Sequence, residues 1–174
     1  GAQWKGASSK IAADIEDLYS LKSVPLAPGT TTTIDADAIL VAGPREKFDS
    51  TSIAALDEAI MRGIPIAFLI DIKSFIAGRF LVMPQDAGLG DLLKHYGFLI
   101  GDRIIFDAQC ESIGLTQNLG GFAYTTNLRY PYIPLIDRIM STHPIGRGLE
   151  AVSLPFTTSV EAVQGLPSTV HFTP

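Results

Sequence analysis

Residues 37–71 read DAILVAGPREKFDSTSIAALDEAIMRGIPIAFLID, and this stretch decides the fold class that we expect. It begins with the apolar run AILVA at 38–42 and closes with a second apolar run, IPIAFLI, at 64–70. Short continuous apolar runs are typical of strands that are covered on both faces of a sheet. Between the two runs, apolar residues recur at helical spacing. The pattern therefore predicts a strand, a helix and a second strand, which together form one parallel crossover unit.

The boundaries of this helix are marked by residues that favour helix ends. Asp49 or Ser50 supplies a side-chain oxygen that can accept a hydrogen bond from the first free amides of the helix. Arg62 suits the negative end of the helix dipole, and Gly63 suits the left-handed residue that follows a helix. We therefore expect the helix to begin at Asp49 or Ser50 and to end before Gly63.

Further elements are predicted on both sides of this unit. Helical spacing indicates helices over 9–21 and 89–96, and 135–140 is expected to form a helical turn. Strands are expected over 103–106, 122–125 and 152–156. Residues 73–86 are expected to form either a long connection or a hairpin around Gly78 and Arg79. Strands that alternate with helices imply a mostly parallel sheet with helices on both faces. We predict a three-layer, flavodoxin-like α/β fold, with residues 1–10 as a flexible lead-in and 11–174 as a single domain.

The central stretch resembles a known family. Residues 41–71 are similar to the extracytoplasmic domain of gliding-motility-type ABC transporter auxiliary proteins, in which a VAGP strand precedes a helix with an LDEYLxRGG pattern. The similarity continues through GLGDLLKHYG at 88–97, HPI at 143–145 and LPF at 154–156, and Ile64 departs from it, where the family usually has glycine. The resemblance implies a fold like that of class I glutamine amidotransferases. It also implies ABC transporter permease and ATPase subunits as partners.

Composition argues against nucleic acid as a partner and leaves the compartment open. Hydrophobic residues make up 47% of the 174 residues, charged residues make up 18%, and the net charge is −5. An acidic chain with scattered Lys and Arg does not suit nucleic acid, whose phosphates require concentrated positive charge. No apolar run reaches the roughly 18–20 residues that span a bilayer, so we expect any membrane anchor to lie outside these residues. The single cysteine permits no internal disulfide, which fits a cytosolic as well as an extracytoplasmic protein.

No catalytic, metal or cofactor site is predicted. A Cys-His hydrolase would use Cys110 and His143, but nucleophilic cysteines of this fold lie on strained turns flanked by small residues, and Glu111 directly follows Cys110. His95, His143 and His171 show no paired metal-ligand spacing. The glycines at 88 and 90 lack the third glycine of a dinucleotide-binding loop, and no GK[ST] phosphate-binding motif is present.

A ligand site is predicted from the positions of polar residues that follow the strands. Arg45 follows the first strand, Asp71 and Lys73 follow the second, and Asp107 follows a third. Because parallel strands joined by crossovers end at a shared edge, we expect these four residues to converge there and to bind a small polar ligand or a peptide loop. The alternative is that Asp71 and Asp107 cap backbone amides or pair with nearby Arg and Lys residues.

Three functions follow from these observations. The resemblance implies a non-catalytic recognition or scaffolding domain of an ABC transporter auxiliary subunit, located outside the cytoplasmic membrane. The first alternative is an amidotransferase-like or other small hydrolase. The second is an oligomeric scaffold domain, because the predicted fold is also similar to that of intraflagellar transport proteins.

Overall fold

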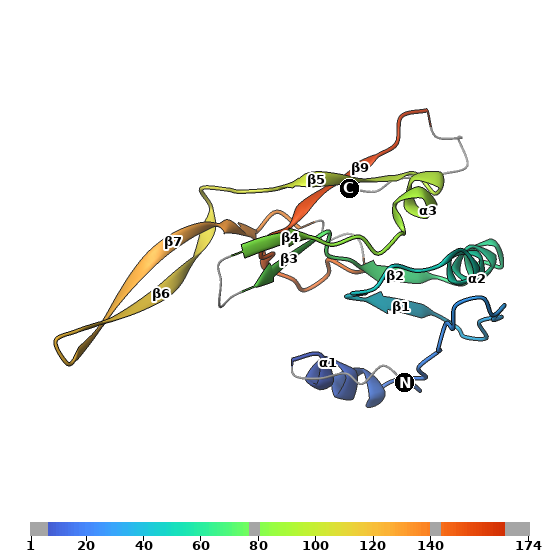
Figure 1. Ribbon diagram of the computed structural model, residues 1–174, viewed down its shortest axis with the longest axis horizontal. Helices are drawn as coiled ribbons and strands as arrows, with labels where there is room; N and C mark the ends of the chain where they lie inside the picture. Colours follow the sequence, from blue (N-terminus) through green and yellow to red (C-terminus); the bar gives the residue numbers. More distant parts are fainter. Residues whose placement is uncertain (1–6, 77–80, 140–143, 166–174) are drawn as a thin grey trace. The chain divides into compact units, whose positions relative to one another are not determined.

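The computed structural model describes residues 7–76, 81–139 and 144–165. The chain divides into two compact units, Gly1–Leu69 and Ile70–Pro174 (Figure 1). Helices account for 16% of the chain, and most of the regular structure consists of strands.

The first unit contains the predicted parallel crossover. Strand β1 (Ile39–Ala42) pairs in parallel with β2 (Ile66–Leu69), and helix α2 (Ser50–Met61) connects them. Helix α1 (Ala7–Glu16) precedes this unit. The strand–helix–strand prediction for 37–71 is therefore confirmed.

Asp49 fixes the start of α2 and also holds a loop that lies twenty residues earlier. Its side chain accepts hydrogen bonds from the Ser52 amide at 2.9 Å, the Thr51 hydroxyl at 2.7 Å and the Gly29 amide at 2.9 Å. Of the two N-cap residues that the sequence allowed, Asp49 is the one used. Hydrogen bonds from the Ser52 side chain, the Thr51 side chain and the Gly29 and Ser52 amides lower the pKa of Asp49 below its usual range, because they stabilise the carboxylate.

Because of this lowered pKa, the stability of the protein decreases at low pH. The unfolded chain binds a proton at Asp49 near the ordinary pKa of 3.8, whereas the folded chain binds it only at lower pH. The stabilisation by the carboxylate is therefore complete above about pH 5 and falls as the pH decreases further. We expect Asp49→Asn, which keeps a capping oxygen but removes the charge, to lower Tm at pH 7 and to have a smaller effect at pH 2.5.

Thermal melts of the two proteins between pH 7 and pH 2.5 test this expectation. A Tm difference that stays constant across the whole range would show that the charge of Asp49 contributes nothing.

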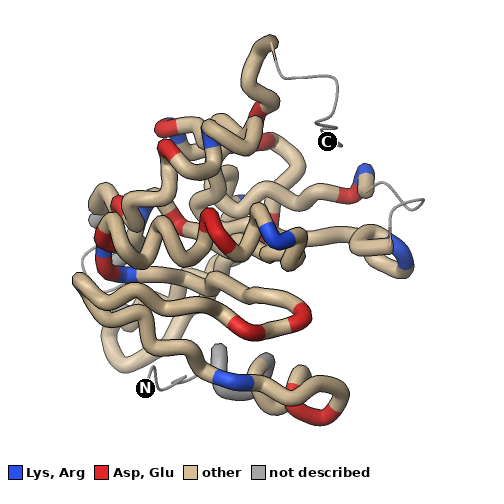
Figure 2. Tube along the Cα trace, turned by 90° about the vertical axis from the view of Figure 1, so that its right-hand side faces the viewer, with Lys and Arg blue, Asp and Glu red and all other residues tan. Residues whose placement is uncertain are grey.

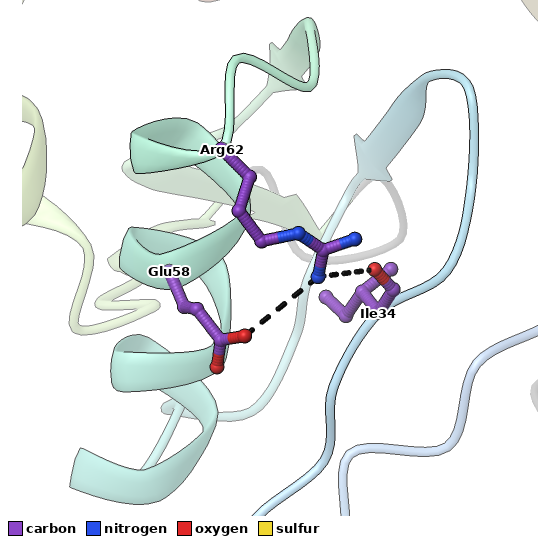
Figure 3. Close-up of polar contacts among 3 residues, drawn as sticks. All are labelled: Ile34, Glu58 and Arg62. Atoms are coloured by element: carbon purple, nitrogen blue, oxygen red, sulfur yellow. Dashed lines mark hydrogen bonds and ion pairs between the residues drawn. The ribbon is translucent and has the colours of Figure 1, made fainter.

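The core of the first unit lies along one side of α2. The buried residues of this helix are Ser52, Ala55, Leu56 and Ala59, and Val41 of β1 is buried as well. Figure 3 shows how the end of the helix holds a distant segment: the Arg62 guanidinium donates a hydrogen bond to the carbonyl of buried Ile34 at 3.0 Å. The same guanidinium lies 3.7 Å from Glu58, but both side chains are substantially exposed, so this ion pair contributes little stability.

In the described part of the second unit, every strand pairing is antiparallel. Strand β3 pairs with β4, β5 with β9, and β7 with both β6 and β8. The elements of this unit are β3 (Lys73–Ile76), β4 (Leu81–Pro84), α3 (Gly90–His95), β5 (Phe98–Ile104), β6 (Cys110–Leu119), β7 (Phe122–Ile136), β8 (Val152–Ser153) and β9 (Thr158–Ala162).

Two local predictions in this unit are confirmed. The β3–β4 pairing is the hairpin expected within 73–86, although Gly78 and Arg79 lie outside the described residues. Helix α3 is the short helix expected over 89–96, and it buries Leu92 and Leu93.

Strands β6 and β7 form a long twisted ribbon (Figure 1). Gly120 and Gly121 connect them with φ of +57° and +88°, which only glycine adopts readily at two successive positions. The ladder runs from Leu119 opposite Phe122 to Ser112 opposite Arg129, where the register shifts. The ribbon is therefore the longest strand pairing within the described residues.

The predicted flavodoxin-like, class I glutamine-amidotransferase-like fold is wrong. Among the described strands, only β1 and β2 pair in parallel, and the others form small antiparallel sheets instead of joining a central three-layer sheet. The reason is that the chain after β2 turns back on itself through hairpins, whereas a parallel sheet needs a crossover helix after each strand. The helical turn expected over 135–140 is also wrong at its start, because Leu135 and Ile136 belong to β7.

Within the described parts of the chain, no helix is long and apolar enough to span a membrane.

Candidate functional site

The four predicted ligand residues are divided between the two units. Arg45 is exposed in the loop between β1 and α2 of the first unit, whereas Asp71, Lys73 and Asp107 belong to the second. Asp71 is exposed ahead of β3, and Lys73 begins β3 opposite Pro84. The geometric reason for including Asp107 does not hold, because β5 runs antiparallel to β9. That the four residues form one ligand site stays a prediction.

Asp107 caps a backbone amide, which is the structural role that was expected as the alternative to ligand binding. Its carboxylate accepts a hydrogen bond from the Gln109 amide at 2.8 Å, which is the geometry of an Asx turn. Its own amide donates to the Pro131 carbonyl at 3.0 Å. These two bonds hold the loop after β5 against β7, so that Phe106 lies on a segment with a defined position.

Neither catalysis nor metal binding gains support from the described residues. Cys110 is half-buried and begins strand β6 opposite Pro134, so it does not occupy the strand-to-helix turn of a nucleophilic cysteine. His143, its suggested partner, lies outside the described residues. Over 7–76, 81–139 and 144–165, no three His, Cys, Asp or Glu side chains are grouped so as to hold a metal ion.

The charges of the chain are dispersed. Figure 2 shows Lys and Arg at separate points along the trace, with long uncharged intervals between them. With a net charge of −5, this distribution gives phosphate groups no basic surface to bind.

The most prominent surface feature of the second unit is a group of aromatic side chains, which we call the aromatic patch: Phe106, Tyr130, Tyr132 and Phe156. The rings of Phe106 and Tyr132 lie 6.3 Å apart, those of Tyr130 and Tyr132 5.7 Å, and those of Tyr130 and Phe156 6.2 Å. Such spacings fall within the range of favourable aromatic pairs. Phe106 nevertheless remains 72% exposed and Tyr132 44% exposed. The patch is therefore organised by its own ring contacts and still open to solvent.

Irregular strand geometry places these rings together. Between the pairs Cys110–Pro134 and Ser112–Arg129, the single residue Glu111 lies opposite the four residues 130–133 of β7. Irregularities of this kind redirect side chains next to functional surfaces. Tyr130 and Tyr132 are two residues apart on an extended segment, so both side chains project to the same side.

Phe156 completes the patch from a third segment and in an unusual conformation. It has φ of +54°, a left-handed backbone that is unfavourable for a bulky side chain by roughly 1–2 kcal/mol. Its amide donates a hydrogen bond to the Tyr132 carbonyl at 2.8 Å, and its ring contacts Tyr130. The local contacts hold the residue in this conformation. Strained residues that surrounding structure holds in place often mark functional surfaces.

Polar contacts fix the strands beneath the patch. The Ser153 hydroxyl donates to the Glu111 carboxylate at 2.6 Å, which links β8 to β6. The Arg129 guanidinium donates to the Ala108 carbonyl, which holds the β5–β6 loop against β7. A rigid base with exposed aromatic rings and the exposed carboxylate of Asp107 suits recognition of a peptide segment.

Sequence reasoning did not find this patch. Residues 129–134, RYPYIP, were given no predicted element, and Phe106 was predicted only as the end of a strand. Tyr130 and Tyr132, in i, i+2 spacing on either side of Pro131, are the local signal that points to aromatic side chains on one face of an extended segment.

Comparison with known proteins relates the chain to one family and to one fold. The model of the ABC-type uncharacterized transport system family matches residues 6–174. A solved structure described as the mmIFT52 N-terminal domain is similar with a TM-score of 0.53 and 17% identity, over 90% of this chain and 65% of that chain. At this identity the likeness concerns the fold alone. Comparison with curated protein sequences gave no match. Because the family model covers nearly every residue, including both units, the chain belongs to the ABC-type uncharacterized transport system family.

Proposed function

We propose that this chain is a non-catalytic recognition or scaffolding domain of an ABC transporter auxiliary subunit of the gliding-motility type. The family is an auxiliary type of transport system, which supports an accessory role. We place the domain outside the cytoplasmic membrane and assign the permease and ATPase subunits as its partners. The resemblance of residues 41–71 supports both assignments.

The observation that carries this proposal is the exposure of the aromatic patch. Large aromatic side chains bury much of their area at interfaces and dominate binding energy there. Phe106 and Tyr132 are held in position by ring contacts and backbone hydrogen bonds, so little conformational freedom remains to be lost on binding. A protein segment with an apolar anchor and a basic group would fit these rings and the adjacent Asp107.

The four predicted ligand residues, Arg45, Asp71, Lys73 and Asp107, remain a weaker proposal for a small polar ligand. Asp107 is common to both proposals, because it directly follows Phe106. The peptide proposal is preferred, since the aromatic rings supply the apolar area that the four polar residues lack.

Binding of the chain to its transport-system partners tests the proposal. We expect the double variant Phe106→Ala and Tyr132→Ala to weaken binding to the permease and ATPase subunits by at least about thirtyfold, since loss of one central aromatic residue costs about 2 kcal/mol. Binding is measured between the purified chain and the subunits reconstituted in detergent. The change in affinity would show that the patch supplies the main contact.

Met61→Ala is the matched control. Met61 is 75% exposed and lies in the first unit, far along the chain from the patch. We expect this variant to bind as the wild type does. If the double variant is folded by circular dichroism and binds unchanged, the aromatic patch is not the recognition surface.

A further inference from the structure

The longest uncharged segment of the chain forms a ribbon that we call the neutral ribbon, residues 112–128 of β6 and β7. It contains no Asp, Glu, Lys, Arg or His, so the net charge of −5 belongs entirely to the rest of the chain. Natural edge strands usually carry charged residues, most often Lys, that prevent pairing with other strands. The neutral ribbon lacks this protection on both of its strands.

The neutral ribbon has two different faces. Side chains alternate along a strand, and directly paired residues share a face. Ile113 therefore lies on the same face as its partner Leu128, as do Leu115, Phe122 and Tyr124, together with the polar Gln117 and Thr126. The opposite face carries Ser112, Thr116, Thr125 and Asn127, and the Thr116 and Thr125 hydroxyls lie 3.0 Å apart there. We call these the apolar face and the polar face.

The part of the apolar face that β7 contributes is open to solvent, whereas Ile113 and Leu115 of β6 are half-buried. Phe122 is 80% exposed and Tyr124 is 68% exposed. Within the described residues, β6 pairs only with β7, and β7 has no second strand partner along 122–129. A two-stranded ribbon alone is marginally stable, and an amphipathic sheet normally buries its apolar face against a second layer. We therefore expect the apolar face to be buried against another molecule.

We infer that the apolar face of the neutral ribbon packs against the same face of a second copy of this chain. A charged partner would gain nothing electrostatically from a ribbon without charges. A second copy of an acidic chain is repelled wherever like charges meet, but not along this segment. Two ribbons related by a twofold axis bury identical faces against each other, as in isologous dimers.

The twofold arrangement also separates the charged ends of the two ribbons. Seven cross-strand pairs, from Ile113–Leu128 to Leu119–Phe122, span about 24 Å at roughly 3.4 Å per residue. With the two ribbons antiparallel, each neutral tip faces the base of the other copy, where Glu111 and Arg129 lie. The two bases are then about 24 Å apart, well beyond the roughly 8 Å screening length at physiological ionic strength.

The size of the face sets the strength of this association. A ribbon about 24 Å long and about 10 Å wide offers roughly 240 Å² per copy, far below the roughly 800 Å² per partner of a standard stable interface. We therefore expect a weak dimer that forms at high protein concentration. This inference goes beyond the proposed function, because it concerns a different surface and needs only the purified chain.

Cysteine cross-linking on the two faces of the ribbon tests the inference. In a Cys110→Ser background, which removes the only native cysteine, Thr126→Cys places a thiol on the apolar face near the centre of the ladder. Thr125→Cys places one on the polar face and is the matched control, because both positions are exposed neighbouring threonines. With a short bismaleimide at high protein concentration, we expect several-fold more cross-linked dimer from Thr126→Cys.

A second substitution tests whether the absence of charge on the ribbon is needed for dimer formation. Tyr124→Lys, added to Thr126→Cys, places like charges on both apolar faces and is expected to reduce the yield of cross-linked dimer several-fold. Equal yields from Thr126→Cys and Thr125→Cys, or no dimer from either protein when both are folded by circular dichroism, would overturn the inference. Protection of the Thr126→Cys thiol by neutral phosphatidylcholine vesicles, with the chain monomeric, would overturn it in favour of a lipid surface.

Discussion

Val41→Asp is expected to unfold the first unit of the chain or to make the protein insoluble. Val41 is 8% exposed on β1 and pairs with Phe68 of β2. Burying a carboxylate at this apolar position without a partner costs several kcal/mol. Typical proteins are stable by only about 5–15 kcal/mol, so the substitution removes a large share of the stability.

Circular dichroism and thermal melting measure this effect, with Leu40→Asp as the matched control. Leu40 is the neighbouring residue of the same strand but is exposed, so its carboxylate stays hydrated. We expect the control to retain a cooperative transition near that of the wild type. An unchanged Tm for Val41→Asp would remove Val41 from the core and refute the packing of the crossover.

We propose that residues 11–174 unfold as one domain, and Val41→Asp examines this proposal too. If the proposal holds, hydrogen exchange will show loss of protection in β5 and β6 of the second unit as well. Protection that is lost in 39–69 alone would show that the two units fold independently.

Leu56→Ala is expected to lower the free energy of unfolding by about 2–5 kcal/mol, the usual cost of truncating a fully buried leucine. Leu56 is 1% exposed on the buried side of α2. The loss has two parts, the apolar area returned to water on unfolding and the cavity left in the core. Chemical denaturation at 25 °C gives the difference directly.

Met61→Ala on the same helix is the control for this prediction. Met61 is exposed, and surface substitutions usually change stability by less than about 0.5 kcal/mol. Similar losses for Leu56→Ala and Met61→Ala would mean that helix propensity, and not burial, determines the effect.

The part of the fold that could be predicted from sequence is the part that local signals determine. Two apolar runs, a capping Asp49 and a terminal Gly63 fully specify the crossover unit, and all of them act within a few residues of the boundary they set. The N-terminal helix was predicted over 9–21 and is found at Ala7–Glu16, which shows that helix periodicity is more reliable than the position of helix ends.

The sheet topology could not be predicted in the same way, because it depends on pairing between distant segments. Strand β5 pairs with β9, which lies more than fifty residues later, and no local pattern indicates that pairing. The long ribbon was predictable in principle. Gly120 and Gly121 form a two-residue turn between alternating segments, but only a strand over 122–125 was predicted there. Without this hairpin, the chain was assigned to a parallel sheet.

The candidate site also depends on contacts between distant segments, which local sequence patterns do not indicate. Arg45, Asp71, Lys73 and Asp107 were chosen because parallel strands share an edge, and that reason fails for Asp107 once β5 is antiparallel. The aromatic patch arises from a loop, an irregular strand and the left-handed Phe156, which come together only in the folded chain. Its residues are separated by up to fifty positions, so sequence spacing gives no sign that their rings meet.

Site-specific photo-cross-linking tests the central claim, that the aromatic patch binds the transport system, most directly. A photoreactive phenylalanine analogue is placed at Phe106 or, as the control, at Met61, in cells that produce the whole transport system. We expect a cross-link from position 106 to the permease subunit and none from position 61. Equal cross-linking from both positions, or none from position 106 with the protein folded and the transport system assembled, would contradict it.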